Sequence, residues 1–211
     1  MIDTEFFVDY LNRLFPDAKA ELDFSNHFEL LVAVVLSAQT TDIAVNKVTP
    51  NLFMKYPDAS HLSKAELSDV ESIIKTIGLY KNKAKNIIEL SKILVDKHHG
   101  LVPNNRNDLE ALPGVGRKTA NVVLSNAFDV PALAVDTHIE RISKRLGLAS
   151  EIDNAYQVEQ KLNSIFDESL WKKLHHQLIF FGRYHCKAKK PNCEVCEMRT
   201  TCPFFNQRLK D

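Results

Sequence analysis

Apolar side chains recur along this 211-residue chain at the spacing of an α-helix. Residues at i, i+3, i+4, i+7 and i+8 share one face, because a helix turns once every 3.6 residues. Four such stripes are Phe28, Leu31, Val32, Val35 and Leu36; Ala120, Val123, Leu124 and Ala127; Val158, Leu162, Ile165 and Phe166; and Trp171, Leu174, Leu178 and Phe181. Only 6 glycines and 8 prolines occur, too few for the many turns of a β-sandwich or barrel. The sequence therefore predicts an all-α fold.

Helix-breaking residues divide this pattern at Pro50, Gly78, Pro113-Gly114 and Pro131. The apolar segment 131–135 has no partner strand, so we expect a buried extended or helical piece rather than part of a sheet. A soft domain boundary falls near residues 129–131, and a short tail rich in cysteine and lysine begins near residue 183. Such a tail is too small to fold around its own hydrophobic core and needs a staple.

Charge is balanced overall, with 27 basic and 27 acidic residues, so net charge alone does not indicate a nucleic-acid partner. The distribution is uneven, since residues 183–211 carry seven bases and three acids while residues 1–30 carry two bases and seven acids. No apolar run reaches the ~18 residues of a membrane helix, and the acidic start MIDTEFFVDY does not resemble a secretory signal. We expect a cytoplasmic protein without membrane contact, and a monomer.

All 4 cysteines lie in the tail, at Cys186, Cys193, Cys196 and Cys202, with the spacing C-x6-C-x2-C-x5-C. Disulfides are disfavoured in a reducing cytoplasm. A four-cysteine zinc site usually pairs two C-x2-C knuckles, and only one is present. An iron–sulfur cluster tolerates uneven spacing, because its iron corners point in different directions. The spacing strongly indicates a metal site and favours a cluster over zinc.

A glycine turn, Pro113-Gly114-Val115-Gly116, joins a short helix ending near Leu112 to a longer one beginning near Arg117. Glycine adopts positive φ without steric cost, so we expect a tight turn whose backbone N–H groups at Gly114, Val115 and Gly116 point outward. A helix N-terminus favours an anion, such as a DNA phosphate bound without sequence preference. The alternative is an ordinary connector between two helices.

Lys118 follows this turn in the first turn of the second helix. With the apolar stripe of that helix buried, its spacing places Lys118, Asn121 and Ser125 on an open face. The positive end of the helix dipole favours the neutral amine, which is a nucleophile able to form a Schiff base. The alternative is a solvated surface lysine. Asp136 begins the next helix as its N-cap, and close to Lys118 it could accept that lysine's proton and stabilise positive charge on a substrate.

In this order, Leu-Pro-Gly-Val-Gly-Arg-Lys (112–118), Val-Asp-Thr-His (135–138) and the cysteine pattern closely resemble the endonuclease III family. The resemblance covers essentially the whole chain, from Phe28 through Leu-Ser-Ala-Gln-Thr-Thr-Asp (36–42) and Gly-Leu-Tyr (78–80) to Cys202. It implies a helix-hairpin-helix DNA glycosylase with AP lyase activity. The implied partner is double-stranded DNA carrying oxidised pyrimidines or abasic sites, and the implied location is the nucleoid in the cytoplasm.

The resemblance also implies two helical domains flanking a DNA-binding cleft. One is a six-helix barrel at 21–130 with its hairpin at about 107–127. The other combines 1–20 with 131–211 and ends in a cluster loop at 186–202, where the four cysteines hold a [4Fe-4S] cluster.

The family's functional residues map onto matching positions of this chain. Lys118 corresponds to the Schiff-base nucleophile and Asp136 to the catalytic carboxylate. Gln39 and Leu79 correspond to residues that enter the duplex, although from the residues alone Leu79 would be core and Gln39 a surface residue at a helix end. The further DNA-contact candidates are Thr137, His138, Lys187, Lys189 and Lys190.

Two alternatives remain at this point. The related adenine-specific mismatch glycosylase typically lacks this lysine and has an additional C-terminal domain, whereas Lys118 is present here and only nine residues follow Cys202. A non-catalytic helix-hairpin-helix protein would use the turn to bind phosphates and a metal to staple the tail.

Overall fold

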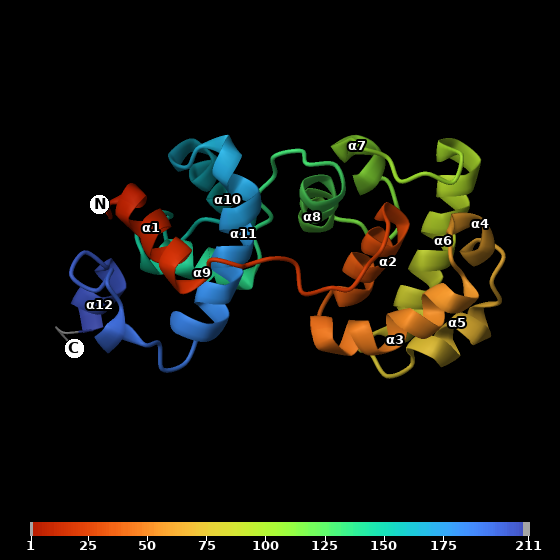
Figure 1. Ribbon diagram of the computed structural model, residues 1–211, viewed down its shortest axis with the longest axis horizontal. Helices are drawn as coiled ribbons and strands as arrows, with labels where there is room; N and C mark the ends of the chain where they lie inside the picture. The colour runs from red at the N-terminus through yellow and green to blue at the C-terminus, as the bar shows by residue number, and fades with distance from the viewer. Residues whose placement is uncertain (1, 209–211) are drawn as a thin grey trace. The chain divides into compact units, whose positions relative to one another are not determined.

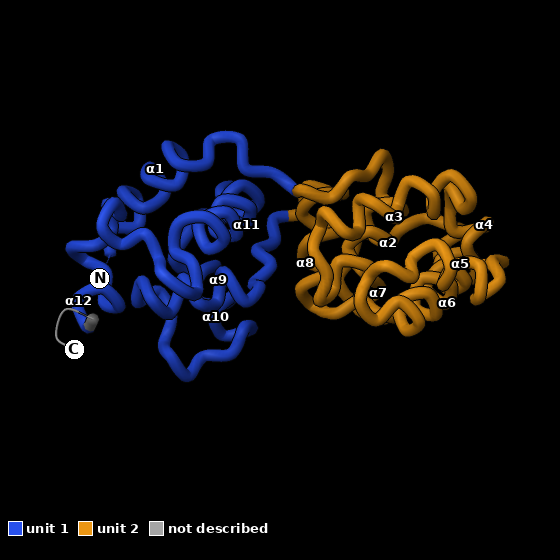
Figure 2. Tube along the Cα trace, turned by 90° about the horizontal axis from the view of Figure 1, so that it is seen from below, with its two compact units in different colours: residues 1–20, 131–211 blue, residues 21–130 orange. Residues whose placement is uncertain are grey.

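The computed structural model describes residues 2–208, and every regular element in this range is a helix. The predicted all-α class is confirmed. The chain divides into two compact units, Glu21–Val130 and Met1–Ala20 with Pro131–Asp211, which are coloured separately in Figure 2. None of the helices within 2–208 is both long and apolar enough to cross a membrane.

The unit formed by residues 21–130 is built around one central helix, α2 (Figure 1). Its elements are α2 (His27–Ser37), α3 (Asp42–Lys55), α4 (Ala59–Leu62), α5 (Leu67–Ile74), α6 (Tyr80–His98), α7 (Arg106–Glu110) and α8 (Arg117–Ala127). Figure 1 shows α2 between α8 and α6, and it contacts both of them and α3. The predicted stripe of α2 is buried, and so are Leu30, Ala33 and Val34, which fall outside it. Helix α2 is therefore covered on several sides.

Pro50 lies inside α3 and does not end it, contrary to the expected break. Proline lacks the N–H that a helix interior uses, so packing must hold the helix together here. Helix α3 buries Val45, Val48, Thr49 and Leu52 and contacts α2 and α5. Tertiary contacts on these neighbours outweigh the local cost of the proline.

The second unit combines the start and the end of the chain. Its elements are α1 (Thr4–Leu14), α9 (Thr137–Arg145), α10 (Ala155–Ile165), η1 (Glu168–Leu170), α11 (Trp171–Phe180), η2 (Phe181–His185), η3 (Cys193–Val195) and α12 (Pro203–Arg208). Helix α11 contacts both α1 and α9. Of the predicted stripe on α10, Val158, Leu162 and Phe166 are buried, but Ile165 is 38% exposed because it ends the helix at the surface.

The segment 131–135 before α9 forms neither helix nor strand, as its lack of a partner strand predicts. Its side chains Ala132, Leu133, Ala134 and Val135 are buried. This apolar piece fixes the start of α9 against the core of the second unit, and Asp136 is the residue at that start.

Candidate active site and cysteine loop

The helix-hairpin-helix consists of α7, the glycine turn and α8. Gly114 has a φ of 80°, and a Cβ added there would lie 2.9 Å from Asn86 Nδ2 and 3.1 Å from Val35 Cγ1. Both the left-handed backbone and the close contact with α6 and α2 require glycine at this position. The turn is thereby fastened to the core of its unit.

The expectation of an open turn holds only in part. Gly116 has a φ of −102° and serves as the N-cap of α8 without any side-chain cap hydrogen bond. A Cβ at Gly116 would meet nothing within 4 Å. Val115 is buried, and its N–H donates to the Leu112 carbonyl at 3.0 Å, so this N–H does not point outward as predicted. The hydrogen bond that closes the turn therefore occupies the Val115 N–H, which the sequence analysis expected to bind a phosphate.

Lys118 is exposed, one residue into α8, as the sequence predicts. Asn121 and Ser125 were expected on the same open face, but both are buried, at 0% and 3% exposure. The prediction was wrong because α8 packs against both α2 and α7, so neighbours cover the polar side of the helix as well as its apolar stripe. Only the first turn of α8 presents Lys118 to a ligand.

Asp136 caps helix α9, as predicted. Its Oδ1 accepts hydrogen bonds from the backbone N–H groups of His138 and Ile139, each at 2.9 Å. These two bonds fix the direction of a half-buried carboxylate at the positive end of a helix. Along the chain, only residues 128–135 separate α8 from this carboxylate.

Two arginines of α9, one in its middle and one at its C-terminal end, bind the backbone around the first cysteine. Arg141 Nη2 donates to the carbonyls of Gly182 at 2.8 Å and Cys186 at 3.2 Å. Arg145 donates to the carbonyls of Lys187 at 2.8 Å and Ala188 at 3.0 Å, and its Nη1 lies 3.5 Å from Cys186 Sγ. The helix that begins with Asp136 therefore also holds the cysteine loop.

The sequence pattern alone did not reveal this role of Arg141 and Arg145. The signal available was the i, i+4 spacing of Arg141 and Arg145, which places both on one face of a helix.

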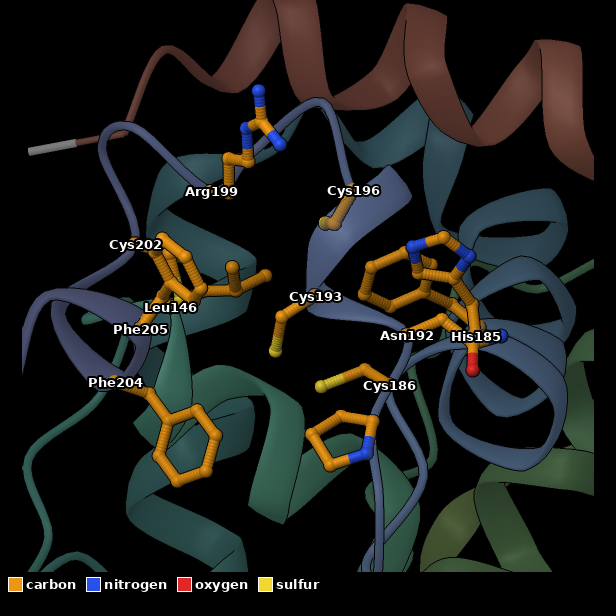
Figure 3. A pocket seen from close by; sticks show the side chains of 12 residues that line it. Leu146, His185, Cys186, Asn192, Cys193, Cys196, Arg199, Cys202, Phe204 and Phe205 are labelled. Atoms are coloured by element: carbon orange, nitrogen blue, oxygen red, sulfur yellow. The ribbon is translucent and has the colours of Figure 1, made fainter. Parts of the chain in front are cut away.

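All four cysteines line one pocket (Figure 3). The other walls include Leu146, Phe181, Phe204 and Phe205, so the surroundings of the thiols are largely apolar. Figure 3 shows the sulfurs of Cys186 and Cys193 pointing into the same space.

Burial controls the protonation of this pocket. It raises the pKa of the Cys196 thiol to about 11, and it also raises the pKa of Cys202. Thiols in such surroundings ionise only when a cation compensates the charge of the thiolate. Among residues 2–208, no three His, Cys, Asp or Glu side chains converge closely enough to hold a single metal ion.

Two turns of the unit formed by residues 21–130 present side chains in an unusual backbone conformation. Gln39, after α2, has a φ of 53°, and Leu79, before α6, has a φ of 59°. Non-glycine residues rarely adopt this left-handed region, and it costs energy. Gln39 is exposed, and Leu79 is 56% exposed, so Leu79 is not the core residue that its apolar side chain alone suggests.

The remaining DNA-contact candidates belong to the second unit. Thr137 is exposed at the first position of α9, whereas His138 is half-buried and burial lowers its pKa. Lys187, Lys189 and Lys190 are all exposed. Because Arg145 binds the carbonyls of Lys187 and Ala188, the backbone of this loop is held while its lysine side chains face solvent.

Comparison with known proteins defines the class of this fold and site. The model of the HhH-GPD superfamily of base excision DNA repair proteins matches residues 32–168. Endonuclease III of Bacillus subtilis is 52% identical over 98% of this chain and 94% of its own length.

Two solved structures are similar over nearly all of both chains. One, of a non-covalent endonuclease III–DNA complex, has a TM-score of 0.95 at 49% identity and covers 100% of each chain. The other, of a trapped endonuclease III–DNA covalent intermediate, has a TM-score of 0.94 at 50% identity and covers 99% of this chain and 100% of the other. The chain belongs to the endonuclease III family within the HhH-GPD superfamily.

Proposed function

We propose that Lys118 is the nucleophile with which this chain performs base excision repair. The activity is that of a bifunctional DNA glycosylase and AP lyase, which removes oxidised pyrimidines from double-stranded DNA and cuts the strand. The observation that carries the assignment is the exposed amine of Lys118 in the first turn of α8, directly after a turn that is fastened to the core through Gly114.

The first chemical step replaces the bond between sugar and base. The neutral amine of Lys118 attacks C1′ of the damaged nucleotide, and the base leaves with the electron pair of the glycosidic bond and takes up a proton. Asp136 stabilises the positive charge that develops on the sugar. Its fixed carboxylate serves this role well, because the two bonds from His138 and Ile139 set its direction before substrate arrives.

The second step cuts the strand. Loss of a proton from the bound amine opens the sugar ring and leaves an imine between Lys118 and C1′. This imine makes the hydrogens at C2′ acidic. Removal of one of them moves its electron pair into a C2′–C3′ double bond and expels the 3′-phosphate by β-elimination. Water then hydrolyses the imine and frees Lys118, so one amine serves both reactions.

The damaged nucleotide must leave the base stack before this chemistry begins, because the enzyme cannot reach a base within the stack. We assign Leu79 as the apolar wedge and Gln39 as the polar filler of the vacated space. An exposed leucine held in a left-handed backbone conformation supports this assignment, since core packing does not account for it.

Phosphate contacts are proposed at the N-terminus of α8, at Gly114 and Gly116, and at Thr137 and His138. Gly116 supports the first of these, because the absence of a Cβ leaves open space in front of an N-terminus without a side-chain cap. Lys187, Lys189 and Lys190 are exposed and suit sequence-independent phosphate contacts. We place the enzyme with the nucleoid in the cytoplasm, where its chromosomal substrate lies.

Cys186, Cys193, Cys196 and Cys202 are proposed to hold a [4Fe-4S] cluster. A four-cysteine zinc site usually pairs two C-x2-C knuckles, and this loop contains only one. A cluster tolerates the uneven spacing of these cysteines, and all four of them line one pocket. When bound, it would supply the positive iron that buried thiols need in order to ionise, and would staple the loop.

Visible absorption and metal analysis of the purified protein test the cofactor. A brown protein with broad visible absorption, containing iron and acid-labile sulfide, is expected. A colourless protein that contains one zinc per chain would contradict the cluster.

A strand-cleavage assay at abasic sites separates the proposed enzyme from a protein that only binds DNA. Wild-type protein is expected to cut a duplex containing one abasic site and leave the undamaged duplex intact. Lys118→Ala is expected to bind the same duplex without cutting it. Binding without cleavage by the wild type would instead support the non-catalytic alternative.

A further inference from the structure

Lys83, in the first turn of α6, is buried, although lysines almost never are unless they are paired. The charge pattern of Lys81, Lys83 and Lys85 suggests a solvated basic cluster, and Lys81 and Lys85 are indeed exposed. Lys83 retains only 4% of its accessible surface, and this burial lowers its pKa. A cation in such a position needs a structural reason.

Lys83 is bonded to both of the turns that carry Gln39 and Leu79. Its Nζ donates to Thr40 Oγ1 at 2.7 Å, one residue beyond Gln39. Its backbone N–H donates to the carbonyl oxygen of Leu79 at 3.1 Å. Lys83 thus joins two segments, each of which contains a non-glycine residue with positive φ.

The two turns also lie close together. A Cβ added to Gly78 would lie 3.8 Å from both the Gln39 carbonyl oxygen and Thr40 Oγ1. Any larger shift of one turn would therefore displace the other or break the bond from Lys83 to Thr40. Because left-handed backbone at Gln39 and Leu79 is costly, the surrounding contacts must hold it in place.

The ammonium group of Lys83 lies where it can hold the turn that contains Thr40. Helix α2 ends at Ser37 with no basic residue in its last turn, so its C-terminal carbonyls lack a cation of their own. Thr40 lies in the turn just beyond this helix end, and its N–H donates to the Ser37 carbonyl at 3.0 Å. Within residues 2–208, Lys83 makes no ion pair with a carboxylate. Its ammonium is thus available to the helix end and the Thr40 hydroxyl.

We propose that Lys83 is a positioning residue that locks the Gln39 and Leu79 turns together, so that the two side chains enter damaged DNA as one preformed pair. This inference rests on the proposed function, in which Gln39 and Leu79 replace the extruded nucleotide. Preformed geometry lowers the cost of opening the duplex at the lesion and contributes little to binding of undamaged DNA.

The test compares binding to two duplexes that cannot be cleaved, one undamaged and one with a tetrahydrofuran abasic analogue flanked by 2-aminopurine. Lys83→Met is expected to lose about tenfold in affinity for the analogue and to lose the rise in 2-aminopurine fluorescence that reports local unstacking. Its affinity for undamaged duplex should stay close to that of the wild type. Lys83→Arg, which keeps the charge and a donor, should recover part of the loss.

Lys85→Met is the matched control, because it removes the same charge from an exposed position on the same helix. It should weaken binding to both duplexes by the same factor, as expected for an electrostatic contact. An equal loss on both duplexes with Lys83→Met would make Lys83 a mere phosphate contact and overturn the proposal. Wild-type behaviour of Lys83→Met on both duplexes would overturn it as well.

Thr40→Val decides the matter if Lys83→Met fails to fold. This change removes the hydroxyl at nearly constant volume and breaks the bond to Lys83. A selective loss of affinity for the analogue is expected here too, and unchanged selectivity in a folded Thr40→Val protein would contradict the proposal. If wild-type protein itself fails to distinguish the analogue or to unstack 2-aminopurine, it is the proposed function that fails.

Discussion

The hydroxyl of Tyr10 lies 3.2 Å from Nε2 of His185, which joins the first helix of the chain to the residue directly before Cys186. The same hydroxyl donates to the Val195 carbonyl at 3.4 Å, directly before Cys196. Both side chains are buried, Tyr10 at 3% and His185 at 8% exposure. Helix α1 therefore packs against the cysteine loop as a lateral support, although it is farthest from it in sequence.

Tyr10→Phe is expected to destabilise this support by about 1 kcal/mol, because it removes a buried hydrogen bond and keeps the ring. For a chain of this size the midpoint of thermal unfolding should fall by about 3 °C. Tyr156→Phe is the control, since Tyr156 belongs to the same unit but is 52% exposed. Equal midpoints for Tyr10→Phe and the wild type would show that the hydroxyl does not hold the loop.

Gly182→Ala is expected to destabilise the protein by about 1–3 kcal/mol through overpacking. The added Cβ would lie 2.8 Å from His138 Cβ and 2.9 Å from Ile142 Cδ1, both on α9. Displacement of α9 should also lower activity, because Asp136 starts that helix. Gly116→Ala provides the contrast in urea unfolding, since its Cβ meets nothing and the cost should stay below about 1 kcal/mol. A Gly182→Ala protein as stable as Gly116→Ala would disprove the close packing.

Asp136→Asn separates capping from catalysis. Asparagine caps helices as well as aspartate, so the free energy of unfolding should change by less than about 0.5 kcal/mol. The negative charge is lost, and base removal should slow by about 100-fold or more. Asp136→Ala should lose activity and about 1 kcal/mol of stability together. Base removal at the wild-type rate by Asp136→Asn would limit this residue to a structural role.

Acid stability should depend on His176, whose burial lowers its pKa from 6.5 to about 4. In the unfolded chain this imidazole protonates near its ordinary pKa, whereas in the folded chain it stays neutral until about pH 4. The unfolded state therefore binds more protons in this window, and stability is lost as the pH falls from about 6.5 to about 4. His176→Gln should flatten the pH dependence of unfolding by an amount on the order of 3 kcal/mol across that window. If the free energy of unfolding of His176→Gln depends on pH as steeply as that of the wild type, the burial of His176 is not the cause of the acid sensitivity.

Much of this architecture follows from sequence patterns with a simple physical basis. Helical periodicity predicts the helix class, and the spacing of the four cysteines predicts that Cys186 and Cys202 face one site. Helix-capping chemistry predicts the start of α9 at Asp136. Each of these signals is local, so it is visible without knowledge of the neighbours.

Features that depend on neighbouring elements escaped prediction. Asn121 and Ser125 are buried because α2 and α7 cover a side of α8 that the apolar pattern leaves open. Lys83 is buried because the turn after α2 provides the Thr40 hydroxyl, which accepts a hydrogen bond from its ammonium group. Pro50 sits within α3 because packing outweighs its local preference. Helical periodicity indicates which apolar residues are buried. It does not indicate which polar side chains are covered by neighbouring helices, or where packing overrides the preference of a proline.

Reductive trapping with borohydride on a duplex with one abasic site tests the central role of Lys118 most directly. Borohydride reduces the imine to a stable amine, so wild-type protein should form a covalent adduct with DNA, and mass spectrometry of its peptides should place the sugar remnant on Lys118. Lys118→Ala should bind the duplex and form no adduct. An adduct of undiminished yield in Lys118→Ala, or a remnant mapped to another amine in the wild type, would contradict the account.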